Sequence, residues 1–256
     1  MERGQGTITL KRVKEVHNLE LVRATDVAHA LPRHIHETLC VAVVDSGARE
    51  CRYKGSRHVI NPGQVQVVMP GETHTCGSAG ERYSYRVICL AEEAVAAVTS
   101  AVLPKSADVY FPCQVIDDVE LCRLFSAAHD ALAGAGGTLE KEAALHRPFA
   151  RLAGYAPGPH AAPSRRGGEH RAVNLIRDYL AEHYEDDVSI NDLALTTGLS
   201  PYHLIHVFTA AVGMSPHAFL NQVRVTRAKE LLAAGGGLAD AALAVGFADQ
   251  SHFQRW

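Results

Sequence analysis

The stretch LALTTGLSPYHLIHVF, from Leu193 to Phe208, carries the strongest fold signal in the chain. An Ala stands four residues before a Gly, which is followed by an apolar residue and then by Ser200-Pro201. A small residue lets two helices cross closely, and Gly suits a turn that needs a positive φ. Ser at an N-cap followed by Pro at the first helical position begins a new helix. The stretch therefore predicts two short helices joined by a tight turn, with Leu204 and Phe208 on the buried side of the second helix.

A second copy of this pattern begins 48 residues later, at Ala242-x-x-x-Gly246-Phe247. With one residue inserted in its turn, Phe253 takes the position that Leu204 has in the first copy. Between the copies, Ser215-Pro216 predicts the start of a long helix that ends near Ala234, before a run of three Gly residues. One such pattern is a weak signal, but two capped copies joined by one long helix predict two helix-turn-helix units. The alternative is a plain helical bundle in which the spacing arises by chance.

The chain changes character twice along its 256 residues, a length that favours two domains. Residues 8–90 contain β-branched and aromatic runs separated by Gly, Pro and Asn, which predict short strands. Residues 91–152 have helical spacing, whereas residues 154–170 are rich in Gly, Pro and Ala and predict a linker. We therefore predict the following organisation: a first domain at 1–153, a linker at 154–170, and an all-helical second domain at 171–256 with its two units at about 189–210 and 238–256.

Composition places the chain among soluble globular proteins, with 47% hydrophobic and 21% charged residues. No apolar run approaches the roughly 18 residues of a membrane helix, and the N-terminus lacks a signal core, so we expect no membrane partner and a cytoplasmic protein. No phosphate-binding Gly loop or nucleophile elbow is visible, so neither an enzyme nor a cofactor is expected. Six cysteines without a CxxC predict reduced thiols: Cys40, Cys51, Cys76, Cys89, Cys113 and Cys122.

Residues 171–256 resemble the DNA-binding domain of the AraC/XylS family of bacterial transcription regulators. MSPHAFLNQVRVTRAKELL (214–232) resembles the linker helix of that family, and VGFADQSHFQRW (245–256) resembles its second motif. The resemblance implies two recognition helices that enter successive major grooves of double-stranded DNA. It also implies a homodimer that responds to a small-molecule effector and has RNA polymerase as a further partner. We expect an activator, with repression as the open alternative. The base-contacting residues implied by position are Tyr202, Ile205 and His206 in the first unit and Gln250, Ser251, Gln254 and Arg255 in the second.

The sequence departs from the family pattern at several positions. His206 stands where the family commonly has Arg, which weakens that contact and makes it sensitive to pH. Residues 165–256 contain eight Lys and Arg against ten Asp and Glu, so the net charge of −2 gives little general attraction for phosphates. We expect Arg224, Arg227 and Lys229 either to contact phosphates or to lie on a solvated helix face. The residue equivalent to Phe208 in the second copy is position 257, so we expect a shortened chain or an impaired second unit.

The first domain contains two related histidine segments, LPRHIHETLC (31–40) and INPGQVQVVMPGETHTC (60–76). His34 and His36 alternate along a predicted strand and so share one face, while His74 follows a Pro-Gly turn. This arrangement resembles the cupin superfamily and the effector-binding domains of AraC-type regulators. The resemblance implies a small β-barrel with a pocket that hydrogen-bonds a polar effector. The ligand-binding residues we expect are His34, His36, Tyr53, His74 and Tyr85.

Two other interpretations of these histidines stay open. Three neutral imidazoles suit a divalent transition metal, although Cys40 stands where metal-dependent cupins usually have Glu. The histidines can also be buried core residues with no ligand. We predict an α+β protein with a cupin-like β-barrel, appended helices and an all-α double helix-turn-helix domain. Its predicted function is ligand-responsive, sequence-specific transcription regulation without a bound metal. The alternatives are a cupin metalloenzyme using His34, His36 and His74, or a sensor with impaired DNA binding.

Overall fold

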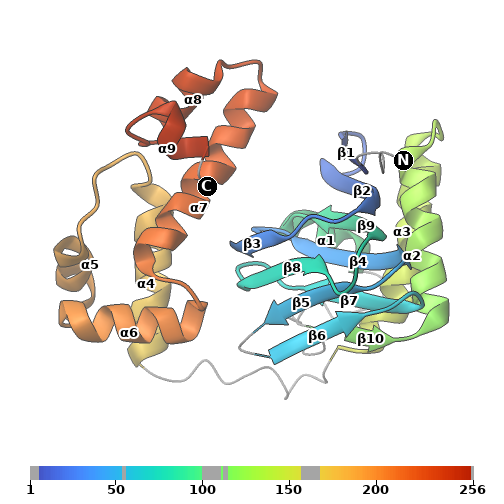
Figure 1. The fold of residues 1–256 in the computed structure, drawn as a ribbon, viewed down its shortest axis with the longest axis horizontal. Coiled ribbons are helices and arrows are strands. Elements are labelled where there is room, and N and C mark those ends of the chain that lie inside the picture. The colour runs from blue at the N-terminus through green and yellow to red at the C-terminus, as the bar shows by residue number, and fades with distance from the viewer. Residues whose placement is uncertain (1–5, 54–55, 100–110, 112–114, 157–167, 255–256) are drawn as a thin grey trace. The chain divides into compact units, whose positions relative to one another are not determined.

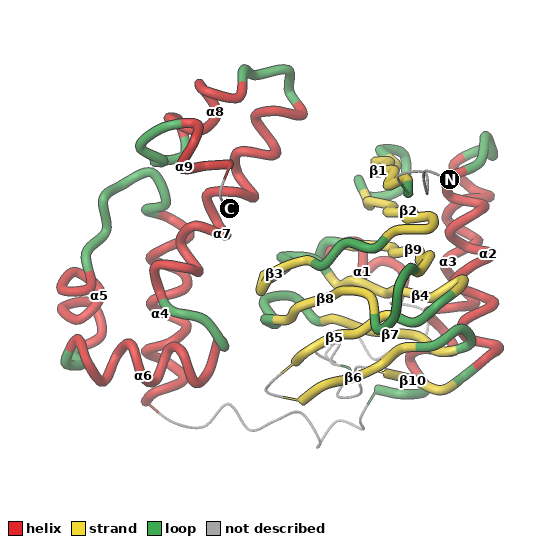
Figure 2. The backbone as a smooth tube through the Cα atoms, in the orientation of Figure 1, coloured by secondary structure: helices red, strands yellow, loops and turns green. Residues whose placement is uncertain are grey.

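The structure, a computed structural model, describes residues 6–53, 56–99, 111, 115–156 and 168–254. Its contacts divide the chain into two compact units, Met1–Pro163 and Ser164–Trp256. The described strands all lie in the first unit, and the described elements of the second unit are all helical (Figure 2). Among the described residues, no helix is long and apolar enough to span a lipid bilayer.

The first unit contains two antiparallel sheets (Figure 1). One has six strands in the order β1-β2-β9-β4-β7-β10, and the other has four in the order β3-β8-β5-β6. The strands are β1 (Thr7–Val13), β2 (Leu19–Val27), β3 (Leu31–His34), β4 (Leu39–Ser46), β5 (Arg49–Tyr53), β6 (Ser56–Ile60), β7 (Gln64–Val68), β8 (His74–Ser78), β9 (Tyr83–Leu90) and β10 (Val115–Asp117). The predicted strands within residues 8–90 are thereby confirmed.

Alternation along the central strands gives the six-stranded sheet two buried faces. Val41 and Val43 of β4 belong to the large core that includes the helices of this unit. Their neighbours Cys40 and Ala42 face the other way, in a second cluster. Because side chains alternate along a strand, one continuous apolar run serves both cores.

Helices α1 (Glu92–Thr99), α2 (Val119–Ala133) and α3 (Thr138–Ala153) follow the strands. Leu121 and Phe125 of α2 are almost fully buried in the core formed with the six-stranded sheet, so this helix covers one face of it (Figure 1). The prediction that residues 91–152 are entirely helical is wrong at β10. The β-branched Val115 and Ile116 extend the edge of that sheet by pairing with β7.

The second unit contains α4 (Gly168–Glu182), α5 (Ile190–Thr197), α6 (Pro201–Val212), α7 (Pro216–Ala233), α8 (Leu238–Ala244) and α9 (Gln250–Gln254). Ser189 forms a capping box with Asp192 at the start of α5, and Ser200 and Ser215 cap α6 and α7. The long helix predicted from Pro216 is confirmed, although α7 ends one residue earlier than expected.

Candidate DNA-binding surface and effector cavity

The first helix-turn-helix unit consists of α5 and α6. Gly198 ends α5 in the left-handed conformation, with φ +71°, and Leu204 and Phe208 are fully buried. Other residues of α6 point outward, and Tyr202 is 84% exposed. Ile205 and His206 are also exposed, so the structure places all three residues predicted to contact bases on the solvent side of α6.

The second helix-turn-helix unit consists of α8 and α9 and has the same kind of turn. Gly246 has φ +86°, and Ala242 and Phe247 are buried. The ring centroids of Phe253 and Phe247 are 5.3 Å apart, but Phe253 is only partly buried, unlike its counterpart Leu204. The exposed residues of α9 include three predicted to contact bases: Gln250, Ser251 and Gln254. Arg255 and Trp256 lie outside the described residues.

Arg224 of α7 contacts both the segment after α4 and Phe247 of the second helix-turn-helix unit. The sequence expectation of a phosphate contact or a solvated side chain is therefore wrong for Arg224. Its Nε donates to the backbone oxygen of Tyr184 at 2.7 Å, and its Nη2 donates to that of Asp186 at 2.8 Å. The side chain is buried, and its guanidinium lies 5.8 Å from the ring centre of Phe247. Arg227 is partly buried and forms an ion pair with Glu230 at 3.4 Å, and Lys229 is exposed.

A cavity of about 90 Å³ lies in the N-terminal unit, Met1–Pro163, with walls from both of its sheets. The register pairs Ala42 with Gln66 and Val87, which places three inward side chains side by side across β4, β7 and β9. The cavity volume is several times the roughly 10–15 Å³ that one water needs. The lining residues are Val22, Leu31, His36, Cys40, Ala42, Arg49, Gln66, Val68, His74, Tyr85, Val87 and Cys89.

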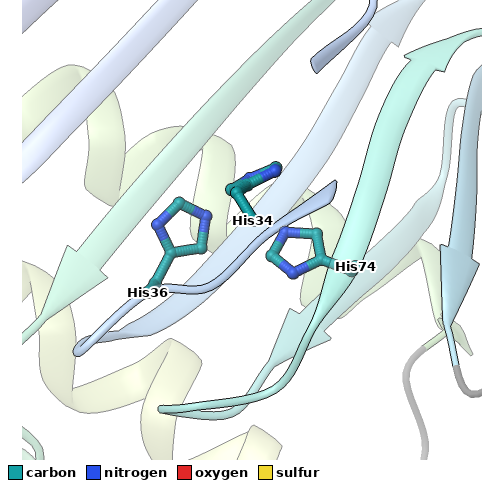
Figure 3. A group of neighbouring side chains, drawn as sticks. All are labelled: His34, His36 and His74. Atoms are coloured by element: carbon teal, nitrogen blue, oxygen red, sulfur yellow. The ribbon is translucent and has the colours of Figure 1, made fainter. Parts of the chain in front are cut away.

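His34, His36 and His74 form a cluster whose ligand-capable ring nitrogens all lie within 4.8 Å of one another (Figure 3). The ring centroids are 4.9 Å apart for His34 and His36 and 4.3 Å apart for His34 and His74. Strand β3 ends at His34, so His36 reaches the cluster from the following loop and not, as predicted, from the same strand. His36 and His74 line the cavity, which places the cluster at its wall.

Backbone oxygens orient the rings of His34 and His74 through Nδ1. The Nδ1 of His34 lies 2.7 Å from the backbone oxygen of Pro32, and that of His74 lies 3.1 Å from the oxygen of Glu72. A carbonyl can only accept, so Nδ1 donates in both rings, and Nε2 is the nitrogen left to face a ligand. Burial and the nearby His74 lower the pKa of His34 to about 4. An imidazole whose Nδ1 is held by a backbone carbonyl is typical of metal-ligating histidines, so the cluster can hold a divalent ion.

The remaining residues expected in the pocket take different positions. Tyr85 lines the cavity and lies 3.2 Å from Nε2 of His29 through its hydroxyl oxygen. The hydroxyl of Tyr53 donates to Glu72, and Tyr53 is not among the cavity-lining residues. Cys40 lines the cavity but is not part of the histidine cluster. Its Sγ lies 3.0 Å from that of Cys89, its cross-strand partner.

Two polar residues of the cavity, Arg49 and Gln66, were not predicted from the sequence. Arg49 is 6% exposed, and its guanidinium carbon lies 4.6 Å from the ring centre of Tyr85. Gln66 is 1% exposed. Their signal is a polar residue at an inward position of a strand, which becomes visible only once the register of the sheets is known.

The fold, the two exposed helix-turn-helix units and the cavity define a regulator with a ligand-binding β-barrel and a double helix-turn-helix domain. The model of the AraC-like ligand-binding domain matches residues 16–147, and that of a helix-turn-helix domain matches residues 193–256. The chain is 30% identical over 253 residues to the HTH-type transcriptional regulator YbfI of Bacillus subtilis, covering 96% of this chain and 89% of that protein. The chain therefore belongs to the AraC family of transcription regulators.

Other similar proteins cover different shares of the chain. The bifunctional transcriptional activator and DNA repair enzyme Ada of Escherichia coli is 31% identical over 107 residues, which are 41% of this chain and 30% of Ada. Two crystal structures of ToxT from Vibrio cholerae have the same fold at low identity. An apo variant has a TM-score of 0.63 at 12% identity and covers 93% of this chain and 91% of ToxT. The form bound to an unsaturated fatty acid has a TM-score of 0.62 at 13% identity and covers 99% of this chain and 91% of ToxT.

Proposed function

We propose that this AraC-family regulator reads its operator with the exposed faces of α6 and α9 and adjusts that binding to an effector held in the cavity. The observation that carries the proposal is the repeated unit: Gly198 and Gly246 both adopt a positive φ and are each followed by a helix with exposed polar residues. A helix of this size fits the major groove. The first domain is taken as residues 1–153 and the DNA-binding domain as residues 171–256.

The proposed base contacts are Tyr202, Ile205, His206, Gln250, Ser251, Gln254 and Arg255. Among them, Arg suits guanine and Gln suits adenine in bidentate pairs, each worth about 1–3 kcal/mol of discrimination. Operators are selected from random duplexes with the full chain, and affinities are then measured at fixed salt. Gln250→Ala is expected to weaken selected sites about 5- to 150-fold while leaving random DNA nearly unaffected.

The matched control is Leu195→Ala, because Leu195 is 83% exposed in the same domain but lies on α5 and outside the proposed readers. It should leave operator affinity unchanged. Equal affinity of the Gln250→Ala and wild-type proteins for the selected duplexes would remove α9 from the proposal.

The effector is proposed to act by binding more tightly to one arrangement of the two domains than to the other, because equal affinity would shift nothing. Ligand capture by His36, His74 and Tyr85 is supported by their place in the cavity wall. The unsaturated fatty acid bound to ToxT in one of the similar structures supports an organic effector in this fold. We further propose a cytoplasmic homodimer that contacts RNA polymerase, tested by light scattering and by transcription reconstituted with purified polymerase.

A second candidate function is metal-dependent regulation, or metalloenzyme activity, at His34, His36 and His74. The observation in its favour is the close approach of three ring nitrogens with Nδ1 of His34 and His74 held by carbonyls. Metal analysis after dialysis against zinc, nickel or iron separates the cases. Stoichiometric metal that is lost in His36→Ala supports this candidate, whereas wild-type protein without bound metal removes it.

A further inference from the structure

Arg49 is a buried cation without a carboxylate partner among the described residues. Its side chain forms no ion pair there, and Nε has no hydrogen-bond partner. The groups around it are the thiols of Cys51 and Cys76 and the phenols of Tyr83 and Tyr85. Burial raises the pKa of Tyr83 to about 12, and it also raises the pKa of Tyr85, so neither phenol carries charge near neutral pH. A buried charge without a good partner is costly, which makes its presence in a cavity wall informative.

The amide of Gln66 is a second buried polar group that faces the same cavity. Neither its Oε1 nor its Nε2 has a hydrogen-bond partner of good geometry in the described part of the chain. The Cys51 thiol, a weak hydrogen-bonding group, lies beside this amide and also beside the charge of Arg49. Since buried polar groups are almost always hydrogen-bonded, a donor and an acceptor here await a partner from the cavity.

The rest of the cavity wall limits the chemistry of that partner. Val22, Leu31, Val68 and Val87 are apolar, so part of the ligand must be apolar as well. A volume of about 90 Å³ holds about six to nine water-sized groups at 10–15 Å³ each. One guanidinium matches one planar monoanion through two parallel N–H···O bonds, whereas a phosphate dianion would leave charge unbalanced.

We propose that the cavity binds a small organic carboxylate with a short apolar tail, the carboxylate on Arg49 and a hydrogen-bonding atom on Gln66. The inference rests on the proposed function, because it names the chemical class of the effector. The ligand thus completes the hydrogen bonds of two groups that the fold leaves unpaired.

The test uses thermal unfolding of the full chain with butyrate, its uncharged isostere butyramide, and sodium chloride at matched ionic strength. Butyrate is expected to raise the Tm in a saturable way, and butyramide and chloride are not. Arg49→Met should weaken butyrate binding roughly 10- to 150-fold, the loss of one charge-assisted hydrogen-bonding pair. It should also raise the Tm of the ligand-free protein, because it removes a buried charge while keeping side-chain volume. If Arg49 had only a structural role, Arg49→Met would instead lower the Tm of the ligand-free protein.

Arg52→Met is the matched control, because Arg52 lies on the same strand but its side chain is 68% exposed. It should keep the butyrate shift. Gln66→Leu should weaken butyrate binding without a large loss of stability. Equal shifts with butyrate and butyramide, an undiminished shift in Arg49→Met, or no shift with any two- to six-carbon monocarboxylate would each overturn the proposal. Operator binding is measured separately, so its loss would count against the proposed function and not against the carboxylate site.

Discussion

The two turn glycines of the DNA-binding domain should respond differently to the same substitution, Gly→Ala. Both adopt a left-handed conformation, with φ +71° at Gly198 and +86° at Gly246. A Cβ in this conformation costs about 1–2 kcal/mol. At Gly198 the added Cβ would meet nothing within 4 Å, so the strain is the whole cost. Gly198→Ala is therefore expected to destabilise the domain by about 1–2 kcal/mol.

At Gly246 the same Cβ would lie 2.7 Å from the backbone oxygen of Glu185 and 2.9 Å from Nη2 of Arg224. The backbone oxygen cannot rotate away. Arg224 is held by two hydrogen bonds to carbonyls, at 2.7 and 2.8 Å, so it cannot move without losing them. Overpacking of this kind adds about 1–3 kcal/mol to the strain. The total cost expected for Gly246→Ala is about 2–5 kcal/mol.

The assay is thermal unfolding followed by far-UV circular dichroism, together with operator affinity below the transition. In a domain of this size, 1 kcal/mol shifts the Tm by roughly 4–8 °C, so the difference between the two variants is measurable. Asn tolerates the left-handed conformation and serves as a control. Gly198→Asn should be nearly neutral, whereas Gly246→Asn should stay strongly destabilising because the clash remains. Equal costs for Gly198→Ala and Gly246→Ala would refute the argument that close packing at the second turn decides the difference.

Three further perturbations address other parts of the molecule. The pKa of His34 is about 4 in the folded protein against 6.5 for a free imidazole, so His34 stays neutral at a pH where the unfolded chain takes up a proton. The free energy of unfolding should therefore fall by at most about 3 kcal/mol as the pH drops from about 6.5 to 4, and urea titrations of His34→Gln should show a shallower fall. Asp118 pairs with Arg151 and accepts a hydrogen bond from the backbone N–H of Leu121, and both contacts lower its pKa, so its contribution to stability is present above about pH 4 and lost on acidification. Asp118→Ala should lower the free energy of unfolding by about 1–2 kcal/mol near neutral pH, measured by urea unfolding, and Asp118→Asn should lower it less. Arg224→Met removes two hydrogen bonds from a buried side chain to the backbone oxygens of Tyr184 and Asp186, so it should lower the Tm by more than Arg227→Met does in the same melting experiment.

The helical domain was largely predictable because its signals are local. A cap, a Pro at the first helical position and a Gly four residues after an Ala each act within one or two turns. Ser200 and Ser215 cap helices as the sequence predicts, and Ser189 caps a third. The expectation for Arg224 was wrong because its partners, the carbonyls of Tyr184 and Asp186, lie about 40 residues away along the chain. A basic residue on a helix with a weak apolar face gives no local sign that it is buried.

The cavity was only partly predictable, because its walls depend on how two sheets face one another. The His-x-His spacing indicated the histidine cluster even though strand β3 ends before His36, since the rings still converge. Arg49 lies in the sequence RECRY, in which both faces of a strand would carry charged residues. In the structure Arg49 shares the inward face with Cys51, while Arg52 points to solvent. Period-two alternation fixes which residues share a face but not which face is inside, so the one charge on the buried side could be recognised only from the packed sheets.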